Sequence, residues 1–269
     1  MNSFNSLYRL NNFIANGFKS KIYSCINNID GQEYICKIVT GDYVYKSRAD
    51  ETNSMLCNHP NINKVHSVFY NTDGTIIKYI VSDMGDGDLF QYIEQQNFNL
   101  SEKTAKNFIK QMSLAIDYLH QNNICHKDIK LENFIYVKSQ SLENDYYNNV
   151  QLKLIDFEFS ENYVKTKMTG RKGTMSYIAP EIYNMEKYTN KIDIWSLGIC
   201  SYMLLMNKNP FNHYRKCRSK VNFDIDFNSS DFDNMSELSI DFLQKLLEKN
   251  PVKRYNSKEV LSHRWLADC

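Results

Sequence analysis

The sequence ICHKDIKLEN occupies residues 124–133 and gathers four polar side chains within eight positions, namely those of His126, Asp128, Lys130 and Asn133. A carboxylate such as that of Asp128 can accept the proton of a substrate hydroxyl, and the ammonium group of Lys130 can meet phosphate charge. The amide oxygen of Asn133 suits Mg²⁺, which prefers hard oxygen ligands. Catalysis of phosphoryl transfer consists mainly of positioning and charge stabilisation, and these are the groups that it needs.

The composition of the chain narrows the class of protein. Of its 269 residues, 42% are hydrophobic and 23% are charged, which is typical of a soluble globular protein with one large domain or two lobes that share a cleft. The net charge of +1 provides no basic field, so nucleic acid is not expected as a partner.

The cysteines and the apolar runs bear on the location of the protein. The seven cysteines are scattered and odd in number, which predicts free thiols in a reducing compartment. The first residues form no signal peptide, and no apolar run is long enough to be a membrane segment. We therefore expect an intracellular protein, either cytoplasmic or nuclear.

The first third of the chain and one later segment favour β-strands. Short runs of apolar and β-branched residues are separated by turn signals, of which Asp30-Gly31 and Asp73-Gly74 are hairpin pairs. Strands are predicted at residues 7–14, 21–26, 32–39, 68–70, 75–81 and 150–155.

The remainder of the chain favours helices. Apolar residues recur at helical spacing over residues 100–122, with Ser101 as the N-cap, which predicts a helix whose apolar face is core. The apolar run at residues 195–206 predicts a buried helix. The polar insert at residues 138–149 predicts a surface loop.

The stretch at residues 126–133 resembles the catalytic loop of protein kinases, H-R-D-L-x-x-x-N, with Lys127 where the family has arginine. Residues 156–158 resemble D-F-G, with Glu158 in place of glycine, and residues 173–181 resemble G-T-x-x-Y-x-A-P-E. Further family-like stretches stand, in the family's order, at residues 34–37, 59–62, 81–90, 193–198, 209–211, 250–254 and 263–266. The resemblance covers residues 8–266 and identifies the chain as a member of the eukaryotic-type protein kinases.

This resemblance implies an α+β fold with two lobes. Residues 1–269 would form a single kinase domain, with a small antiparallel sheet and one main helix in an N-lobe of about residues 1–84 and mostly helices in a C-lobe of about residues 85–269. Glu181 and Arg254 would form a buried structural ion pair. ATP and Mg²⁺ would bind between the lobes.

The resemblance also implies which residues bind the phosphates of ATP. The turn at residues 14–22 stands where the family has G-x-G-x-x-G-x-V, and small residues replace two of the glycines, so a weakened phosphate cover is expected. Lys37 would hold the α- and β-phosphates, oriented by Glu51 more readily than by Asp50. The predicted residues of this part of the site are Ile14, Ala15, Gly17, Ser20, Ile22, Lys37 and Glu51.

Residues 81–90 resemble the hinge between the lobes. The small side chain of Ser82 would guard the back of the pocket, and backbone groups of Asp83 and Met84 would meet the adenine edge. Asp88 would accept hydrogen bonds from the ribose hydroxyls. Taken alone, Asp88 is simply an acid at a helix N-terminus and Lys37 an edge-strand lysine that faces solvent.

For catalysis, the resemblance implies that Asp128 accepts the hydroxyl proton and that Lys130 steadies the γ-phosphoryl group. Asn133 and Asp156 would hold Mg²⁺. Lys130, two residues after Asp128, and Thr174, its expected contact, resemble the residues found at these positions in serine/threonine kinases. The acceptor would therefore be a protein serine or threonine.

The substrate and the subgroup are expected from weaker features. The carboxy-terminal motifs are most similar to the calcium/calmodulin-dependent kinase group. Glu132, with help from Asp86 or Asp88, would attract a basic residue upstream of the acceptor.

Two further hypotheses concern regulation and activity. Thr169 is a candidate phosphosite whose phosphate would dock on Lys127, but lysine lacks the bidentate fork of arginine, so activity should depend weakly on it. A pseudokinase, which binds nucleotide or partners without catalysis, is the alternative to an active enzyme. Departures from the family pattern favour it at Ala15, Ser20, Lys127 and Glu158, whereas catalysis is favoured by the intact groups of Lys37, Asp128, Asn133 and Asp156.

Overall fold

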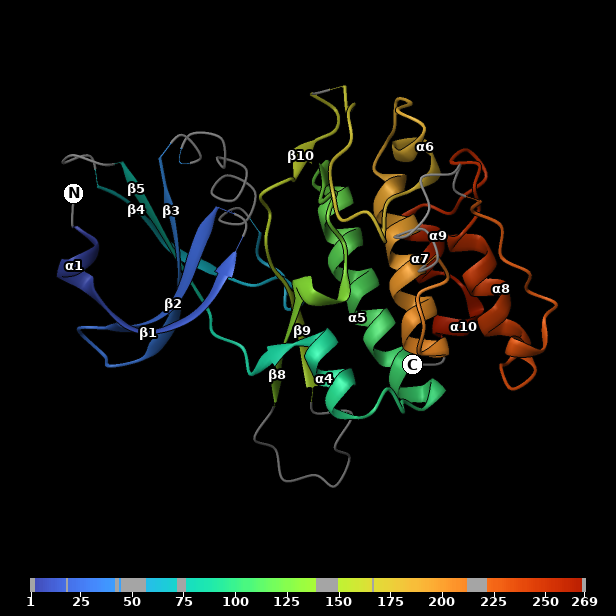
Figure 1. Cartoon of the computed structure of the whole chain (residues 1–269), viewed down its shortest axis with the longest axis horizontal. Coiled ribbons are helices and arrows are strands. Elements are labelled where there is room, and N and C mark those ends of the chain that lie inside the picture. Colours follow the sequence, from blue (N-terminus) through green and yellow to red (C-terminus); the bar gives the residue numbers. More distant parts are fainter. Residues whose placement is uncertain are drawn as a thin grey trace.

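The computed structural model describes residues 3–17, 19–41, 44, 57–71, 76–138, 150–165, 167–211 and 222–267. Its strands before residue 84 and its helices after residue 88 form two parts that lie side by side (Figure 1). Asp50, Glu51, Asp73-Gly74 and most of the predicted surface loop lie outside the described residues. Within the described part of the chain, no helix has both the length and the apolar character that crossing a membrane requires.

A five-stranded antiparallel sheet in the order β1-β2-β3-β5-β4 builds the amino-terminal part. The predicted strands are confirmed to within three residues at each end. The strands are β1 (Tyr8–Gly17), β2 (Ser20–Asn27), β3 (Glu33–Thr40), β4 (Val65–Asn71) and β5 (Ile77–Ser82).

The two faces of this sheet have different roles. The short helix α1 (Phe4–Leu7) places Phe4 against one face, where it joins a buried apolar cluster that includes Cys36 and Val81. Because neighbours along a strand point to opposite faces, Lys37 and Ser82 lie on the other face. The sheet therefore holds its own core on one side and presents Lys37 on the other.

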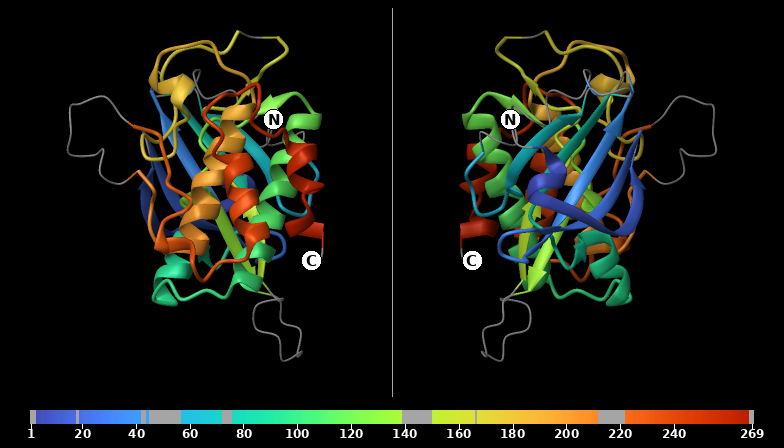
Figure 2. Two further views of the ribbon diagram at one scale, coloured as in Figure 1. Left: turned by 90° about the vertical axis from the view of Figure 1, so that its right-hand side faces the viewer. Right: turned by 90° about the vertical axis from the view of Figure 1, so that its left-hand side faces the viewer.

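The carboxy-terminal part is built around two long helices. The helix α5 (Glu102–Gln121) begins at Ser101, whose hydroxyl accepts a hydrogen bond from the backbone N–H of Thr104 at 3.1 Å. It packs beside the buried helix α7 (Lys191–Met206), as Figures 1 and 2 show. Both helices were predicted from their apolar patterns, and both are confirmed.

Shorter elements surround α5 and α7 and complete the two-lobed α+β fold. The helices are α4 (Leu89–Gln95), α6 (Pro180–Tyr183), α8 (Glu237–Leu246), α9 (Ser257–Leu261) and α10 (Arg264–Ala267), with 3₁₀ turns η1 (Leu131–Asn133) and η3 (Ser230–Phe232). One small sheet has the order β6-β8-β9 and another pairs β10 with β7. Their bounds are β6 (Gly87–Asp88), β7 (Ile124–Cys125), β8 (Phe134–Lys138), β9 (Val150–Leu154) and β10 (Glu161–Asn162).

A buried ion pair connects α6 with the loop before α9. Arg254 donates to both carboxylate oxygens of Glu181, at 2.7 and 3.0 Å, and its guanidinium group lies 5.1 Å from the ring centroid of Trp195. Both charged side chains are almost fully buried. The pair fixes the segment at residues 173–181 against the core of the lobe.

Candidate active site

Asp193, in the first turn of α7, holds the loop at residues 126–133 in place. Its carboxylate accepts hydrogen bonds from the backbone N–H groups of His126 at 2.8 Å and Lys127 at 2.9 Å, and from the ring of His120 at 2.9 Å. Burial alone would raise the pKa of Asp193, but the bonds from His120 and His126 outweigh burial and lower it. These bonds hold Lys127 in a left-handed conformation with a φ of 68°, which is uncommon for a residue with a side chain.

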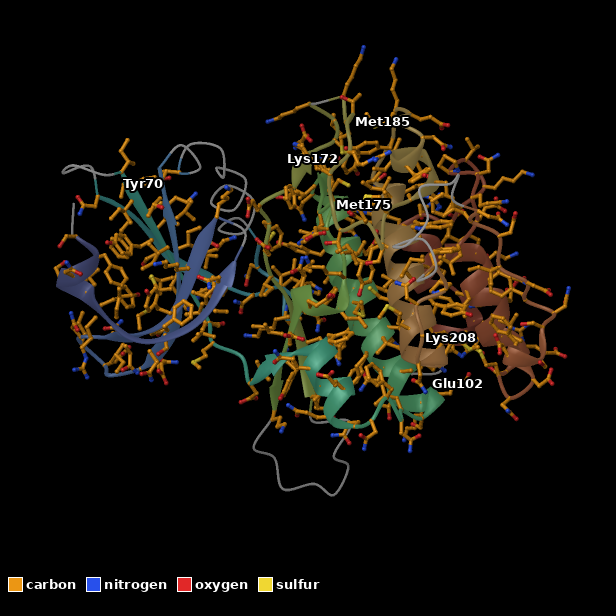
Figure 3. The ribbon with its side chains drawn as sticks, in the orientation of Figure 1. Tyr70, Glu102, Lys172, Met175, Met185 and Lys208 are labelled. Atoms are coloured by element: carbon orange, nitrogen blue, oxygen red, sulfur yellow. The ribbon has the colours of Figure 1, made fainter. Side chains whose placement is uncertain are left out.

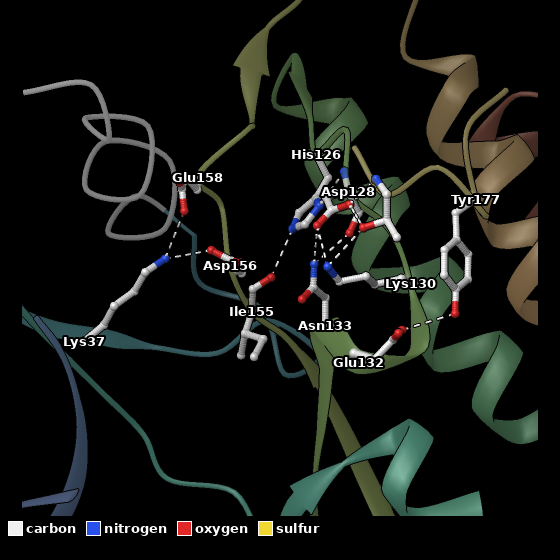
Figure 4. Close-up of polar contacts among 11 residues, drawn as sticks. Lys37, His126, Asp128, Lys130, Glu132, Asn133, Ile155, Asp156, Glu158 and Tyr177 are labelled. Carbon is white, nitrogen blue, oxygen red and sulfur yellow. Dashed lines mark hydrogen bonds and ion pairs between the residues drawn. The ribbon is translucent and has the colours of Figure 1, made fainter. Parts of the chain in front are cut away.

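Both carboxylate oxygens of Asp128 are engaged by the chain itself (Figure 4). One accepts from the Nζ of Lys130 at 2.8 Å and the Nδ2 of Asn133 at 3.2 Å. The other accepts from the backbone N–H and the hydroxyl of Thr174, at 2.9 and 2.8 Å. Lys130 also donates to the Thr174 hydroxyl at 3.1 Å, so these four residues form one closed network.

Gly173 allows the segment that carries Thr174 to approach the loop. Its φ of 96° is one that L side chains rarely adopt, and a Cβ there would lie 2.6 Å from the backbone oxygen of Lys127. The contact between Thr174 and Asp128 therefore depends on a glycine at this position.

Asp156 stands directly across from Lys37, after the end of β9. Its Oδ1 lies 2.7 Å from the Nζ of Lys37, and its φ is 62°. The preceding carbonyl, that of Ile155, accepts from His126 at 3.1 Å. Burial would raise the pKa of Asp156, but the charges of Lys37, His126 and Lys130 lower it, so this carboxylate is ionised at neutral pH.

Asp156 and Asn133 offer the oxygen donors that Mg²⁺ prefers. Among the described residues, both hydrogen bonds of the Asn133 side chain use its amide nitrogen, which leaves the amide oxygen for another partner. The side chain of Asp156 is one third exposed, and only its Oδ1 contacts Lys37. A carboxylate and an amide oxygen, completed by phosphate oxygens and water, fit the ligand set of this ion.

Glu158 has a partner that sequence reasoning missed. Its Oε2 lies 3.7 Å from the Nζ of Lys37, and its side chain is only 13% exposed (Figure 4). In the sequence, Glu158 stands out only as a departure from the family's glycine. The cost of burying an unpaired carboxylate could have pointed to a cation nearby, but not to which one.

Lys127 also has a carboxylate partner that was not predicted. It forms an ion pair with Glu161 of β10, and its own side chain is 1% exposed. Thr169 is exposed, and its backbone oxygen accepts from the Tyr188 hydroxyl at 3.3 Å. The docking of a Thr169 phosphate on Lys127 would therefore compete with a buried contact that already exists.

Most side chains at the turn between β1 and β2 are more exposed than those of the loop at residues 126–133. Ile14, Ala15 and Gly17 are exposed, as is the rest of β1 after Tyr8. Ser20 is 8% exposed, and its hydroxyl has no hydrogen-bond partner among the described residues.

The strand register places Ser20 relative to Lys37. Ser20 pairs with Val39, and Ile22 pairs with Lys37. Because paired residues of antiparallel strands point to the same side, Ser20, Ile22 and Lys37 share one face of the sheet.

Asp83 links the two parts of the molecule through its side chain. Its carboxylate accepts from His66 of β4 at 2.5 Å and from Lys153 of β9 at 3.0 Å. Burial would raise the pKa of Asp83, but these two partners lower it. Sequence reasoning predicted a role only for its backbone, and Met84 beside it is exposed.

The remaining acidic candidates have local hydrogen bonds. Asp88 caps α4 by accepting from the backbone N–H of Gln91 at 2.8 Å, and Asp86 accepts from that of Lys138 at 2.7 Å. Glu132 is exposed and accepts from the buried Tyr177 hydroxyl at 3.1 Å.

Comparison with known proteins gives consistent matches. The family described as protein kinase domain matches residues 8–266. A probable serine/threonine-protein kinase pXi of Dictyostelium discoideum is 30% identical over 268 residues, which cover 98% of this chain and 36% of that protein. Death-associated protein kinase 2 of Mus musculus is 37% identical over 216 residues, which cover 77% of this chain and 55% of that protein.

A further relative, a probable myosin light chain kinase of Dictyostelium discoideum, is 30% identical over 215 residues, covering 78% of this chain and 52% of that protein. The chain thus spans about one third to one half of the length of these relatives.

Proposed function

The chain belongs to the protein kinase family, and on this premise we propose that it transfers the γ-phosphate of ATP to serine or threonine side chains of proteins. The observation that carries the proposal is the closed network around Asp128, in which Lys130 and Thr174 contact each other and the carboxylate. The name of one relative, a probable serine/threonine-protein kinase, supports the class of acceptor.

In this proposal Asp128 is the catalytic base. Its side chain is 4% exposed and is held by donors on both oxygens, so it can receive the hydroxyl proton without first being ordered. A positioned base contributes about 10²- to 10⁴-fold to a rate. Lys130, whose Nζ lies 2.8 Å from an oxygen of Asp128, would stabilise the negative charge of the transferred group beside that base.

ATP would be held by residues of both lobes. Lys37 would bind the α- and β-phosphates, and Ile14, Ala15, Gly17, Ser20 and Ile22 would cover them. Ser82, Asp83, Met84 and Asp88 would surround the adenosine, and Glu51 keeps its proposed role with Lys37. Asp156 and Asn133 would hold Mg²⁺, whose charge neutralises the phosphates.

A pseudokinase is the second candidate function, and Glu158 is the observation that favours it. Its negative charge lies 3.7 Å from Lys37, where phosphates would also bind. The order of the loop around Asp128 argues against it, because a chain released from catalysis would not need both carboxylate oxygens held. We therefore rank the active enzyme first.

The proposed protein substrate carries a basic residue upstream of its acceptor. Glu132 supports this, since it is exposed and held by Tyr177, and the Asp86 and Asp88 carboxylates add negative charge. An intracellular setting, cytoplasmic or nuclear, is supported by the free thiols of Cys25, Cys36, Cys125 and Cys200.

Labelled ATP with Mg²⁺ and a generic basic protein provide the test. We expect phosphate transfer by the natural chain and none by Asp128→Asn. Binding of ATP, seen as a Mg²⁺-dependent thermal shift, without any transfer would instead support the pseudokinase.

A further inference from the structure

We propose that Glu158 is a positioning residue for Lys37, which it holds in place for the phosphates of the nucleotide. The inference rests on the proposed function, since it assumes that Lys37 binds phosphate. It assigns a task to a residue that otherwise counts only as a departure from the D-F-G motif.

The geometry around Lys37 is the first step. Its ammonium group lies 2.7 Å from an oxygen of Asp156 and 3.7 Å from an oxygen of Glu158. The two acids are two residues apart, with Phe157 between them, and the backbone of Asp156 is left-handed. Figure 4 shows both side chains directed at Lys37.

Burial is the second step. The side chains of Lys37 and Glu158 are 17% and 13% exposed, whereas that of Asp156 is 33% exposed. A contact between partly buried charges is screened less than one in water. The contact of Glu158 is therefore expected to restrain Lys37 more than a surface pair would.

The third step is that Asp156 and Glu158 would have different roles. Asp156, with Asn133, supplies the oxygen donors that fit Mg²⁺. Its carboxylate would therefore have to bind both the metal and Lys37. Glu158 contacts Lys37 but belongs to no such donor set. A second carboxylate allows Lys37 to remain oriented while Asp156 serves the metal.

The opposite hypothesis is that Glu158 is tolerated drift. It predicts that the family's glycine, restored by Glu158→Gly, improves nucleotide binding or leaves it unchanged. Positioning predicts that both Glu158→Gly and Glu158→Gln weaken binding and that Glu158→Asp restores part of it. The two hypotheses therefore differ in the sign of one measurement.

The experiment measures binding of MgADP and of adenosine to the whole chain by calorimetry. Because Lys37 acts on phosphates, we expect Glu158→Gln to weaken MgADP binding by about tenfold, within the range found for contacting residues, and to leave adenosine binding unchanged. In a Lys37→Met background the same substitution should have no further effect on MgADP. Asp231→Asn is the matched control, since it removes an equal charge from the exposed pair with Lys208.

Several outcomes would overturn the inference. Equal losses for MgADP and adenosine would indicate a general structural role, and tighter MgADP binding by Glu158→Gly would indicate drift. An unchanged affinity of Glu158→Gln would remove the role altogether. A natural chain that binds neither ligand would contradict the proposed function itself, and the two failures are thereby distinguished.

Discussion

The catalytic loop and the β1–β2 turn represent two extremes of organisation within one proposed site. Both carboxylate oxygens of Asp128 accept hydrogen bonds from neighbouring residues, and Asp193 holds the backbone of the loop at residues 126–133. In the turn, by contrast, Ile14 is exposed and the Ser20 hydroxyl lacks a partner among the described residues. The part expected to perform proton transfer is thus held by hydrogen bonds between side chains, whereas the part expected to cover the nucleotide is paired through its backbone and exposes most of its side chains.

This difference indicates where binding energy would be used. A preorganised base and its cation cost little reorganisation during the reaction, so the loop's contribution would be to the rate. An open turn gains its contacts only when a ligand arrives, so its contribution would be to affinity. Substitutions in the two regions should therefore separate kcat from KM.

The largest effect is expected for Asp128→Asn. The amide cannot accept the proton, so kcat should fall by about 10²- to 10⁴-fold. The KM for ATP should change little, because no nucleotide-binding role falls on Asp128. Steady-state kinetics with the basic protein substrate measures both, and a raised KM with unchanged kcat would contradict the separation of roles.

The anchor below the loop gives the next largest effect. Asp193→Asn replaces an ionised acceptor of three bonds by a neutral amide, and hydrogen bonds to charged groups are each worth about 1.5–3 kcal/mol. We expect a lower melting temperature at pH 7 together with reduced kcat. Because the folded pKa of Asp193 is lowered, its stabilising contribution is present above the unfolded pKa and disappears as the pH falls through the folded pKa.

The exposed pair of Asp231 and Lys208 supplies the control for Asp193. Both of its side chains are about half exposed, and Lys208 lies at the surface in Figure 3. Asp231→Asn should change stability by at most about 1 kcal/mol. Equal losses for the two variants would mean that the loop is not anchored as the contacts indicate.

A smaller effect is expected for Ser20 in the turn. Ser20→Ala removes a hydroxyl that shares a face with Lys37, so we expect MgATP affinity to fall by about two- to tenfold, the value of one hydrogen bond, with kcat unchanged. The MgATP affinity of Ser20→Gly, which restores the family's residue, should fall as well. Tighter binding by the glycine variant would show that serine merely weakens the phosphate cover.

Local patterns predicted the elements, because strand alternation and the helical spacing at residues 100–122 depend on neighbours along the chain. The family resemblance predicted two long-range contacts that the structure contains, that of Thr174 with the catalytic residues and that of Glu181 with Arg254. The partners of Lys37 and Lys127 could not be found that way, because Glu158 lies far from Lys37 in sequence and Glu161 contacts Lys127 only through the pairing of β10 with β7.

Two predictions about the coupling of the sheet to the rest of the site have no structural outcome. Glu51 lies outside the described residues, so its role with Lys37 stays a prediction. The lobe boundary at about residue 84 also stays a prediction, although the side chain of Asp83 bridges strands of both parts there. Both concern how the sheet is coupled to the rest of the site, which motif spacing describes less well than the loop itself.

The smallest effect is expected for Thr169, and it tests whether the loop's order is built in. Thr169 is exposed, as are Lys172 and Met175 of the same segment, which Figure 3 labels. Since Lys127 is already paired with Glu161, a phosphate on Thr169 would add only an exposed interaction. Thr169→Ala should therefore keep kcat within about fivefold of the natural chain. Glu161→Gln, in contrast, leaves Lys127 buried without that carboxylate and should make activity depend on Thr169. Loss of activity in Thr169→Ala alone would show that the loop is ordered by phosphate after all.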